Sequence, residues 1–554
     1  MKRTRGKKGR TMGRVMDQMA LAEVRGLLTN ESRQRDMLIE HLHKIQDNFH
    51  YISHNHILAL AMEMNIPMAE IYETATFYHH FDVIKEGPTP PPLLTVRICN
   101  SLTCAMFGAR ELINELSSAT IPGVRIQQVP CVGRCQAAPV AVVSTNPVEH
   151  ADQNKIMVAI SAKKFDADAP DCLTYNEYKI SGGYNTLQAC SAGKYTRDHI
   201  IKLLEDSSLR GLGGAGFPVG KKWRILLGMP KPKHIAINID EGEPGTFKDR
   251  HYLERDPHRF LEGTLIAHWA IEADAIYIYL RDEYAGCRKM LEREISILQK
   301  NPPCTLPPIH LRRGAGAYIC GEESAMIESL EGKRGMPRLR PPYVAQVGLF
   351  GRPTLEQNME SMHWIRDIIE KGPQWFAAHG RHGRKGLRSF SVSGRVQTPG
   401  VHLAPAGITI RELIDEYCGG MLSGHKFYGY FPGGASGGIL PASMDELPLD
   451  FDTLQPYGCF IGSAAIIIFS DKDSARMLAL NAMRFFEDES CGQCTPCRVG
   501  TAKAVKLMEQ EDWNQDLLLE LAQAMEDASI CGLGQAAPNP LRCAMKYFPG
   551  EFEQ

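Results

Sequence analysis

Cys491-Gly-Gln-Cys494-Thr-Pro-Cys497 places three thiols within seven residues of the chain. The C-x2-C-x2-C spacing lets one tight loop direct three sulfurs at a single [4Fe-4S] cubane and leaves the fourth iron for a more distant cysteine. Cys531, in Ser-Ile-Cys-Gly-Leu-Gly, lies beyond a predicted helix and is the expected fourth ligand. A structural zinc site is the alternative, although four-cysteine zinc sites usually combine two C-x2-C pairs on two loops. The spacing therefore favours a [4Fe-4S] cluster, held by the mostly helical residues 471–554.

A second set of cysteines lies further upstream, as Cys99-x4-Cys104 and Cys131-x3-Cys135. The alternation and helical periodicity of residues 93–162 predict a compact α/β unit, and both pairs fall in its turns. Two pairs on two neighbouring loops suit a [2Fe-2S] rhomb, in which each pair holds one iron. Zinc is again the alternative, and here the spacing separates the two metals less well.

The size and charge of the chain limit the remaining possibilities. With 554 residues it needs several domains, and a net charge of −2 marks no general surface for nucleic acid or membrane. Residues 1–30 are expected to be a basic tail, residues 31–88 a small helical bundle, and no segment is apolar and long enough to span a membrane. Eight of the sixteen cysteines belong to the two sets, so we expect no disulfides and a reducing cytoplasm.

A glycine-rich loop, Gly211-Leu-Gly213-Gly214-Ala-Gly216-Phe217-Pro218, contains the G-x-G-x-x-G pattern. In a Rossmann domain this pattern follows a strand and opens a helix. Here residues 199–206 are predicted to be helical and the loop ends in Phe-Pro, which argues against a standard dinucleotide fold. The glycines still allow backbone N–H groups to approach a phosphate or a planar ring, and Lys222 follows within a turn.

Two acidic loops accompany the glycine loop. One is Asn238-Ile-Asp240-Glu241-Gly-Glu243, and the other ends in Gly321-Glu322-Glu323. Carboxylates suit ribose hydroxyls and repel a 2′-phosphate, so the loops favour NAD over NADP. The glycine run at residues 433–438 is expected to be a structural loop, and the nineteen histidines show no metal-binding pattern, with His79 and His80 expected to be packing or surface groups.

The order of these motifs along the chain resembles that in the flavin-binding, NADH-oxidising subunit of respiratory complex I. Residues 31–162 resemble the thioredoxin-like [2Fe-2S] subunit of the same complex, fused in front. The resemblance covers nearly the whole chain after the basic tail. It implies an α/β multidomain fold: a helical bundle (31–88), a thioredoxin-like [2Fe-2S] domain (93–162), a linker (163–195), an FMN/NAD-binding α/β domain (196–385), a β-grasp domain (386–470) and a helical [4Fe-4S] domain (471–554).

The resemblance also implies residue roles. FMN is expected to contact Gly213, Gly214, Lys222, Asn238, Asp240, Gly321 and Glu322. Phe217 and Tyr343 match aromatic residues that sandwich the adenine of NADH, whereas Glu243, Tyr318 and Glu323 match residues around the nicotinamide and its ribose. Further expected cofactor contacts are Gly211, Gly216, Glu241, Gln357, Asn358 and Leu533. Gln357 departs from the family, which often has asparagine there. Hydride exchange needs no general base, and Glu243 is the side chain expected at the reaction centre.

Among enzymes that reuse this module, the chain looks most like the β (diaphorase) subunit of NAD-dependent formate dehydrogenases. The stretch 530–540, Ile-Cys-Gly-Leu-Gly-Gln-Ala-Ala-Pro-Asn-Pro, followed by Tyr547-Phe-Pro549, favours this reading. It implies a hetero-oligomer with a molybdenum- or tungsten-containing catalytic subunit that has its own iron–sulfur clusters. Electrons from formate would then reach FMN and NAD+. The alternatives are the diaphorase subunit of an NAD-coupled hydrogenase, a complex I-like NADH dehydrogenase module, and a non-catalytic electron carrier.

Overall fold

A computed structural model describes residues 16–85, 89–119 and 121–553. It separates into two compact units, which are described in turn. The first comprises Met1–Pro91 with Glu331–Arg334, and the second comprises Pro92–Leu330 with Gly335–Gln554. The lysines and arginines at positions 2–14, which define the expected basic tail, lie outside the described residues. No helix in the described part of the chain is long and apolar enough to cross a membrane.

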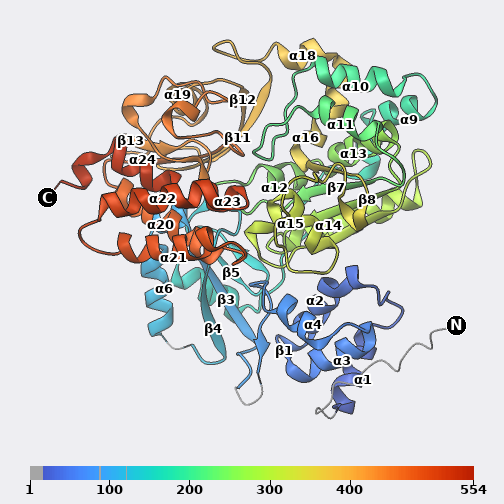
Figure 1. Cartoon of the computed structure of the whole chain (residues 1–554), viewed down its shortest axis with the longest axis horizontal. Helices are drawn as coiled ribbons and strands as arrows, with labels where there is room; N and C mark the ends of the chain where they lie inside the picture. Colours follow the sequence, from blue (N-terminus) through green and yellow to red (C-terminus); the bar gives the residue numbers. More distant parts are fainter. Residues whose placement is uncertain (1–15, 86–88, 120, 554) are drawn as a thin grey trace. The chain divides into compact units, whose positions relative to one another are not determined.

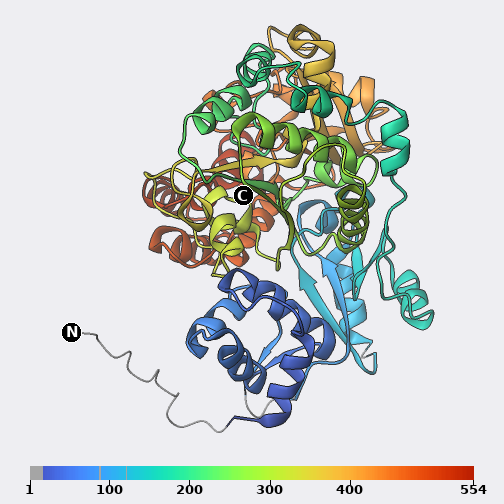
Figure 2. The ribbon, with the colours of Figure 1, turned by 90° about the vertical axis from the view of Figure 1, so that its right-hand side faces the viewer.

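The first unit is a small helical bundle around a short pair of parallel strands (Figure 2, dark blue). Ser53 begins the third helix with a capping box, in which its side chain accepts from the backbone of His56. The elements are α1 (Gln18–Leu27), α2 (Leu38–Phe49), β1 (Ile52–Ser53), α3 (His54–Met64), α4 (Met68–Ala75) and β2 (Val83–Ile84).

The first helix corrects one expected boundary, because the expected tail extends to residue 30. The Asp17 side chain accepts from the backbone N–H groups of Met19 and Ala20 and so caps α1. Leu21 and Val24 are buried, and α1 packs against α3. The apolar face is only two turns long and borders a strongly basic segment, so its periodicity is a weak signal in the sequence.

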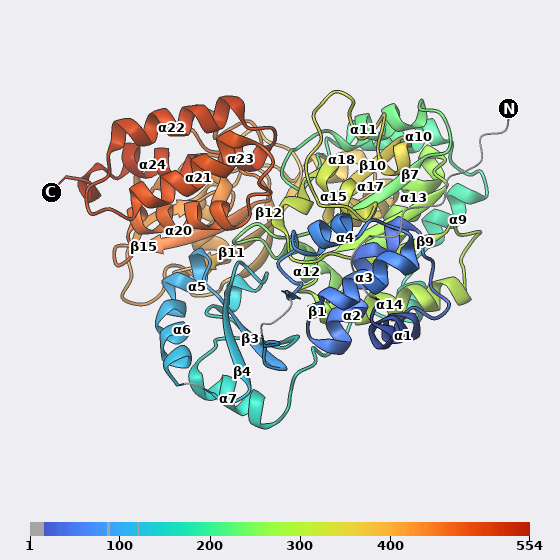
Figure 3. The same ribbon diagram turned by 60° about the horizontal axis from the view of Figure 1, so that its bottom comes forward.

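The domain expected to be thioredoxin-like contains a four-stranded sheet in the order β4-β3-β5-β6, with β3 and β4 parallel and the other pairs antiparallel (Figure 3). Val96 and Ile98 of β3 pack in one core with Leu112, Leu116 and Ile156 from the helices. The elements are β3 (Leu94–Cys99), α5 (Leu102–Met106), α6 (Ala109–Ser118), β4 (Val124–Val129), β5 (Ala141–Val143), β6 (Asn146–Val148) and α7 (Gln153–Ser161).

The expected linker at residues 163–195 is in large part a component of the next domain. It contains α8 (Tyr175–Ile180) and α9 (Asn185–Ser191), whose neighbouring tyrosines are buried in the core of the central domain. The Tyr178 hydroxyl donates to Glu262 Oε2 at 2.6 Å, and the Tyr184 backbone N–H donates to the same oxygen at 2.9 Å. Because these tyrosines stand among polar residues, the segment has no clear apolar period in the sequence.

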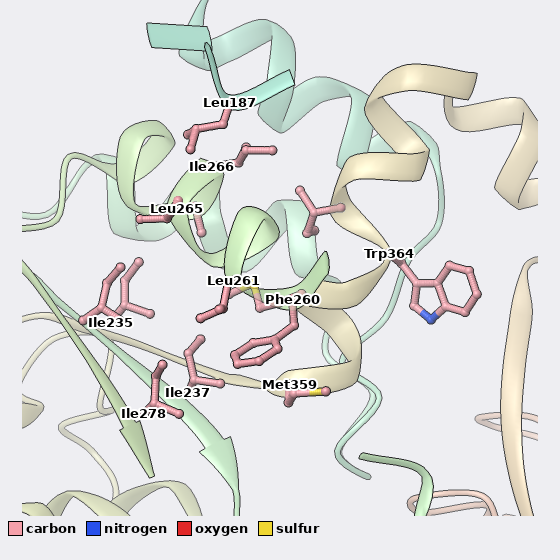
Figure 4. Close-up of a cluster of buried hydrophobic side chains, with 14 of the residues drawn as sticks. Leu187, Ile235, Ile237, Phe260, Leu261, Leu265, Ile266, Ile278, Met359 and Trp364 are labelled. Carbon is pink, nitrogen blue, oxygen red and sulfur yellow. The ribbon is translucent and has the colours of Figure 1, made fainter. Parts of the chain in front are cut away.

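The central domain is built on a parallel sheet in the order β10-β7-β8-β9. Ile235 and Ile237 of β7 and Ile278 of β8 face Phe260 and neighbouring residues of α13 (Figure 4). Every residue of β8 is buried, as expected for a strand covered on both faces. The strands are β7 (His234–Ile239), β8 (Ala275–Leu280), β9 (Ile309–Arg313) and β10 (Thr354–Asn358).

Helices surround this sheet and connect its strands (Figure 1). They are α10 (Arg197–Asp206), α11 (Val219–Leu227), α12 (Lys248–Leu253), α13 (Pro257–Ile271), α14 (Ala285–Lys300), α15 (Glu323–Leu330), α16 (Met359–His363), α17 (Ile365–Lys371) and α18 (Pro373–Ala377). The glycine loop therefore runs from α10 to α11 and follows a helix rather than a strand, as the sequence predicts.

The last two regions are a mixed sheet and a set of helices. The sheet has the order β12-β11-β15-β13-β14 with a parallel central pair, β11 and β15, and one helix, α19. Beyond it, α20, α21, α22 and α24 pack side by side (Figures 1 and 3). The elements are β11 (Leu387–Gly394), β12 (Gly400–Pro405), α19 (Ile410–Tyr417), β13 (Phe427–Phe431), β14 (Leu440–Pro441), β15 (Ala465–Ser470), α20 (Ala475–Asp488), α21 (Thr495–Met508), α22 (Gln515–Ala528), α23 (Gly532–Ala536) and α24 (Asn539–Tyr547).

Candidate functional site

The second unit contains a cavity of about 320 Å³, which is within the usual size range of cofactor pockets. It lies where β7 and β10 end, and open parallel sheets bind ligands at the carboxyl ends of their strands. Its wall combines the glycine loop, the two acidic loops, the mixed sheet's glycine run and the short helix α23. Segments far apart in the sequence thus meet at one pocket.

Eleven of the residues predicted to bind cofactors line this cavity: Gly213, Gly214, Asn238, Asp240, Glu241, Glu243, Tyr318, Gly321, Glu322, Asn358 and Leu533. Seven others are outside its wall: Gly211, Gly216, Phe217, Lys222, Glu323, Tyr343 and Gln357. Two of these seven, Phe217 and Tyr343, are large aromatic side chains left 41% and 54% exposed. Their exposure leaves both rings accessible to a second ligand.

The glycine loop approaches the wall too closely for larger residues. A Cβ atom on Gly213 would lie 3.0 Å from Asn358 Cβ, and Gly214 has a φ of +129°, which side chains rarely adopt. The two glycines therefore leave backbone exposed to the cavity. This surface fits a flat ring system.

Behind the wall, Lys222 anchors the loop to β10. Its Nζ donates to the Glu356 backbone oxygen at 2.6 Å and pairs with Glu356 Oε2 at 3.1 Å. Asn238 Nδ2 donates to Glu356 Oε1 at 3.0 Å and to the Gly321 oxygen at 2.9 Å. Glu356 thus links the start of α11, which follows the glycine loop, to Asn238 of the first acidic loop, and Asn238 in turn links to the second.

Two buried acceptors at this site have no hydrogen-bond partner, namely Asp240 Oδ2 and Gln357 Oε1. Burial raises the pKa of Asp240 well above its ordinary value. Leaving a buried polar atom unpaired costs about 1–3 kcal/mol, so such atoms usually mark a missing partner. A polar ring edge or a hydroxyl-bearing chain in the cavity would supply one. The residues present therefore fit FMN through Asp240, whereas Gln357 lies outside the cavity wall and its contact with the flavin stays a prediction.

Glu243 is held by two different domains. Its Oε1 accepts from the backbone N–H of Ser436 at 2.7 Å and from the Ser436 hydroxyl at 2.8 Å, and its Oε2 accepts from the Tyr318 hydroxyl. Burial raises the pKa of Glu243. Ser436 belongs to the glycine run expected to be a purely structural loop, and that expectation was wrong: Gly433 and Ser436 line the cavity.

Two other acidic residues have their carboxylates engaged at helix starts. Glu241 accepts from the backbone N–H of Asp249 at 2.8 Å and from the Tyr284 hydroxyl at 2.7 Å. Burial, with a smaller contribution from Asp249, raises the pKa of Glu241 to about 7. Glu322 accepts from the N–H groups of Ser324 and Ala325, at 3.0 and 2.9 Å, in the first turn of α15. Both residues therefore position the loops that carry them.

A buried charged group on the wall is absent from the sequence predictions. Lys248 Nζ lies 2.8 Å from Asp249 Oδ1 and 2.9 Å from Glu360 Oε2. Asn358 Nδ2 donates to Asp249 Oδ2 at 2.7 Å. The segment that contains Lys248 and Asp249 directly follows the first acidic loop. This position is the one signal in the sequence that could have indicated the buried ion pair.

The first cysteine set forms an enclosed group in the thioredoxin-like domain. Cys99 ends β3, Cys104 lies in α5, and Cys131 and Cys135 follow β4; all four are at most 5% exposed. Cys131 Sγ and Cys135 Sγ are 3.3 Å apart, and the backbone N–H of Gly133 donates to Cys131 Sγ at 3.4 Å. The sulfurs thus converge as a [2Fe-2S] cluster requires.

The second set surrounds the start of α21. Cys491 and Cys494 lie in the loop after α20, Cys497 is in α21, and Cys531 immediately precedes α23. A Cβ on Gly534 would lie 2.8 Å from Cys497 Cβ, so α23 approaches the thiols closely. Burial raises the pKa of Cys531 to about 12, a penalty that bound iron would remove.

The spacing of both sulfur sets also bears on the zinc alternative. A single zinc ion would bring its four sulfurs to about 3.8 Å from one another, given Zn–S bonds of about 2.3 Å. Among the described residues, three or more potential ligands lie within 4.8 Å of one another at His43, Asp47 and His80, and not at either cysteine set. Cys131 Sγ and Cys135 Sγ are only 3.3 Å apart, so the sulfur positions alone do not decide between the metals, and the assignment of iron rests on the spacing of the cysteines in the sequence.

Three family models match the chain. The Nuo51 FMN-binding domain matches residues 204–367, the NADH-ubiquinone oxidoreductase-F iron-sulfur binding region matches residues 477–554, and the thioredoxin-like [2Fe-2S] ferredoxin matches residues 24–164. An NADH-quinone oxidoreductase subunit of Rhizobium meliloti (strain 1021) is 40% identical over 402 residues, which are 70% of this chain and 95% of that protein. This chain belongs to the family of the FMN-binding subunit of NADH-quinone oxidoreductase.

Another member of the family and one solved structure extend the similarity. The mitochondrial NADH dehydrogenase [ubiquinone] flavoprotein 1 of Dictyostelium discoideum is 37% identical over 445 residues, 76% of this chain and 92% of that protein. A chain of an NAD+-reducing [NiFe]-hydrogenase, solved in the H2-reduced state, matches with a TM-score of 0.81 and 31% identity over 94% of this chain and 93% of that one. The chain is thus an oxidoreductase module with FMN, a [4Fe-4S] and a [2Fe-2S] cluster.

Proposed function

We propose that this chain exchanges a hydride between NAD(H) and FMN and relays single electrons between that flavin and a partner subunit. The observation that carries the proposal is the position of α23. Cys531, a ligand of the expected [4Fe-4S] cluster, is followed directly by Gly532 and Leu533, which line the cavity. Flavin site and cluster therefore share one turn of backbone.

When bound, FMN would link the two-electron chemistry of NAD(H) to the one-electron chemistry of the clusters. The chain's contribution is to bind and orient. Gly213 and Gly214 present backbone to the ring system, while Asn238, Asp240 and Asn358 offer polar groups at its edges. Phe217 and Tyr343, exposed outside the wall, are the proposed adenine contacts.

Glu243 is proposed as a positioning group for the nicotinamide side of the pocket. Its two oxygens are fixed by Tyr318 and Ser436, so the carboxylate cannot rotate freely into the cavity. This arrangement keeps a rigid polar wall in place and moves no proton. The acidic groups around the cavity also disfavour a 2′-phosphate, which supports NAD rather than NADP.

Three kinds of partner are candidates. The match to the hydrogenase chain covers nearly all of both chains, and together with the NADH-quinone oxidoreductase relatives it supports a hydrogenase-type or complex I-type partner better than a formate dehydrogenase. The closing stretch, residues 530–540 with Tyr547-Phe-Pro549, supports the formate dehydrogenase assignment, with a molybdenum or tungsten subunit. In each of these settings the present chain is the NAD(H)- and FMN-binding subunit.

The test is anaerobic purification of the chain with whatever partner it retains. Added NADH is expected to bleach the flavin band and to reduce an artificial dye. A colourless protein, or iron absorption that does not respond to NADH, would refute the proposal. Nickel in the co-purified partner identifies a hydrogenase, and molybdenum or tungsten with formate-dependent NAD+ reduction identifies a formate dehydrogenase.

A variant sharpens the test at residue level. Glu243→Ala is expected to lower kcat/KM for NADH-dependent dye reduction about tenfold, because it removes the anchor for Tyr318 and Ser436. Iron content should remain at the wild-type value. Loss of iron would mean that Glu243 maintains the fold around the clusters rather than the nicotinamide side of the pocket.

A further inference from the structure

Three side chains of metal-binding type converge in the first unit, which contains neither cysteine set. His43 and Asp47 are one turn apart on α2, and His80 follows α4; their donor atoms all lie within 4.8 Å of one another. The rings of His43 and His80 have centroids 5.1 Å apart. We propose that His43, Asp47 and His80 bind one divalent transition-metal ion.

The two backbone segments that carry these ligands are fastened to each other. Gln46 Nε2 donates to Asp82 Oδ2 at 3.4 Å, and the Asp82 backbone N–H donates to Gln46 Oε1 at 3.0 Å. The strands β1 and β2, which follow α2 and His80, pair in parallel. Because the segments are already held together, little ordering remains for the ion to impose.

The surroundings of the three side chains change from apolar and buried at His43 to solvent-exposed at Asp47. His43 is 2% exposed, and its ring lies 4.8 Å from that of the buried Phe81. His80 is half-buried and Asp47 is exposed. An ion can therefore enter past Asp47 and reach the two imidazoles at the inner end.

The donor set determines the class of metal. Two imidazole nitrogens and one carboxylate suit Zn²⁺, Ni²⁺ or Co²⁺, whereas Mg²⁺ and Ca²⁺ prefer all-oxygen ligands. Asp47 offsets one of the ion's two positive charges. Three protein ligands leave room for water, and the ion would join α2 to the segment after α4. The proposal does not depend on the proposed electron-transfer function.

The test uses the complete, anaerobically purified chain with its iron counted before and after. The protein is dialysed to equilibrium against Zn²⁺, and zinc is counted by mass spectrometry. The wild type is expected to take up one zinc per chain with no loss of iron. His80→Ala and Asp47→Asn are expected to bind that zinc at least about tenfold more weakly. His79→Ala, at the exposed neighbouring histidine, is the matched control and should bind as the wild type does.

Hydrogen exchange locates the bound ion. Zn²⁺ should slow amide exchange in residues 38–49 and 78–84 of the wild type and of His79→Ala, with no such effect in His80→Ala. Equal zinc binding by wild type and His80→Ala would overturn the proposal, as would zinc uptake that occurs only with loss of iron at the cysteines.

Discussion

The two cysteine sites differ in how far they are enclosed. All four thiols of the [2Fe-2S] site are buried, whereas three of the four at the [4Fe-4S] site are half-buried. Arginines of the central domain hold the enclosed site: Arg281 Nη2 donates to the Cys131 backbone oxygen at 2.6 Å, and Arg250 Nε donates to the Gly133 oxygen at 2.9 Å. The open site instead shares the turn at Cys531 with the wall of the cavity.

This difference in exposure and nearby charge is expected to give the two clusters different reduction potentials. A half-buried cluster beside the cavity is suited to pass electrons to a partner surface. The potential of the enclosed cluster is expected to be set by its low exposure and by the positive charge of the neighbouring buried arginines. Arg281 also donates to the Glu241 backbone oxygen, so the enclosed site is attached to the acidic loop of the cavity.

The largest expected effect comes from removing one cysteine ligand of the half-buried [4Fe-4S] site. Cys494→Ser should remove the [4Fe-4S] cluster, about four irons per chain, and abolish electron transfer to the partner. Flavin content and direct dye reduction by NADH should persist, because the cavity wall keeps its residues. Iron analysis and electron paramagnetic resonance of the reduced protein measure the loss. Cys418→Ser, at a buried thiol outside both sets, is the control, and an unchanged iron count in Cys494→Ser would contradict the ligand assignment.

Replacement of Arg281 is expected to change the enclosed [2Fe-2S] site. Arg281→Leu removes a buried cation that joins the Cys131 loop to the Glu241 loop, at an expected cost of about 4 kcal/mol in unfolding free energy. The resonance signal of the [2Fe-2S] cluster should change, and that of the [4Fe-4S] cluster should not. Arg255→Leu, at an exposed arginine, controls for loss of charge. A change in both signals would show that Arg281 stabilises the whole unit without distinguishing the sites.

The sequence reveals the two cysteine sites more completely than it reveals the cavity between them. Cluster ligands come in short, spaced groups, so the spacing of Cys491, Cys494 and Cys497 is enough to predict them as ligands. The glycine and acidic loops are local patterns as well. Ser436 and Lys248 acquire their places only when separate domains meet, and no short-range pattern records such a meeting.

The helix predictions show the same limit. Regular periodicity predicts α6 and α19 within a residue or two, because one face of each is buried. The buried tyrosines of α8 are surrounded by polar residues, and Glu262, the partner of Tyr178, is 84 positions away. The His43, Asp47 and His80 group combines an ordinary helical spacing with a distant turn, so its members are recognisable only in three dimensions.

The acidic loop that contains Glu241 is expected to make the free energy of unfolding depend on pH. The pKa of Glu241 is about 7 in the folded chain, above the ordinary value of 4.5, so burial opposes its ionisation. The contribution of neutral Glu241 to the free energy of unfolding is therefore fully present below pH 4.5. This contribution is lost as the pH rises through 7. In Glu241→Gln this loss, about 3 kcal/mol, should disappear. Thermal unfolding midpoints of both proteins from pH 4.5 to 8 measure it; parallel curves would contradict burial as the cause.

The smallest expected effect lies at the exposed rim, away from both clusters. Tyr343→Ala should raise KM for NADH about two- to tenfold, because stacking on an aromatic ring contributes about 0.5–1.5 kcal/mol. Tyr343→Phe keeps the ring and should leave KM unchanged, since the hydroxyl sits on a side chain that is 54% exposed. Both variants should keep wild-type iron and flavin. If Tyr343→Phe matched Tyr343→Ala, the contact would be a hydrogen bond through the hydroxyl, and the ring would not be part of an adenine sandwich.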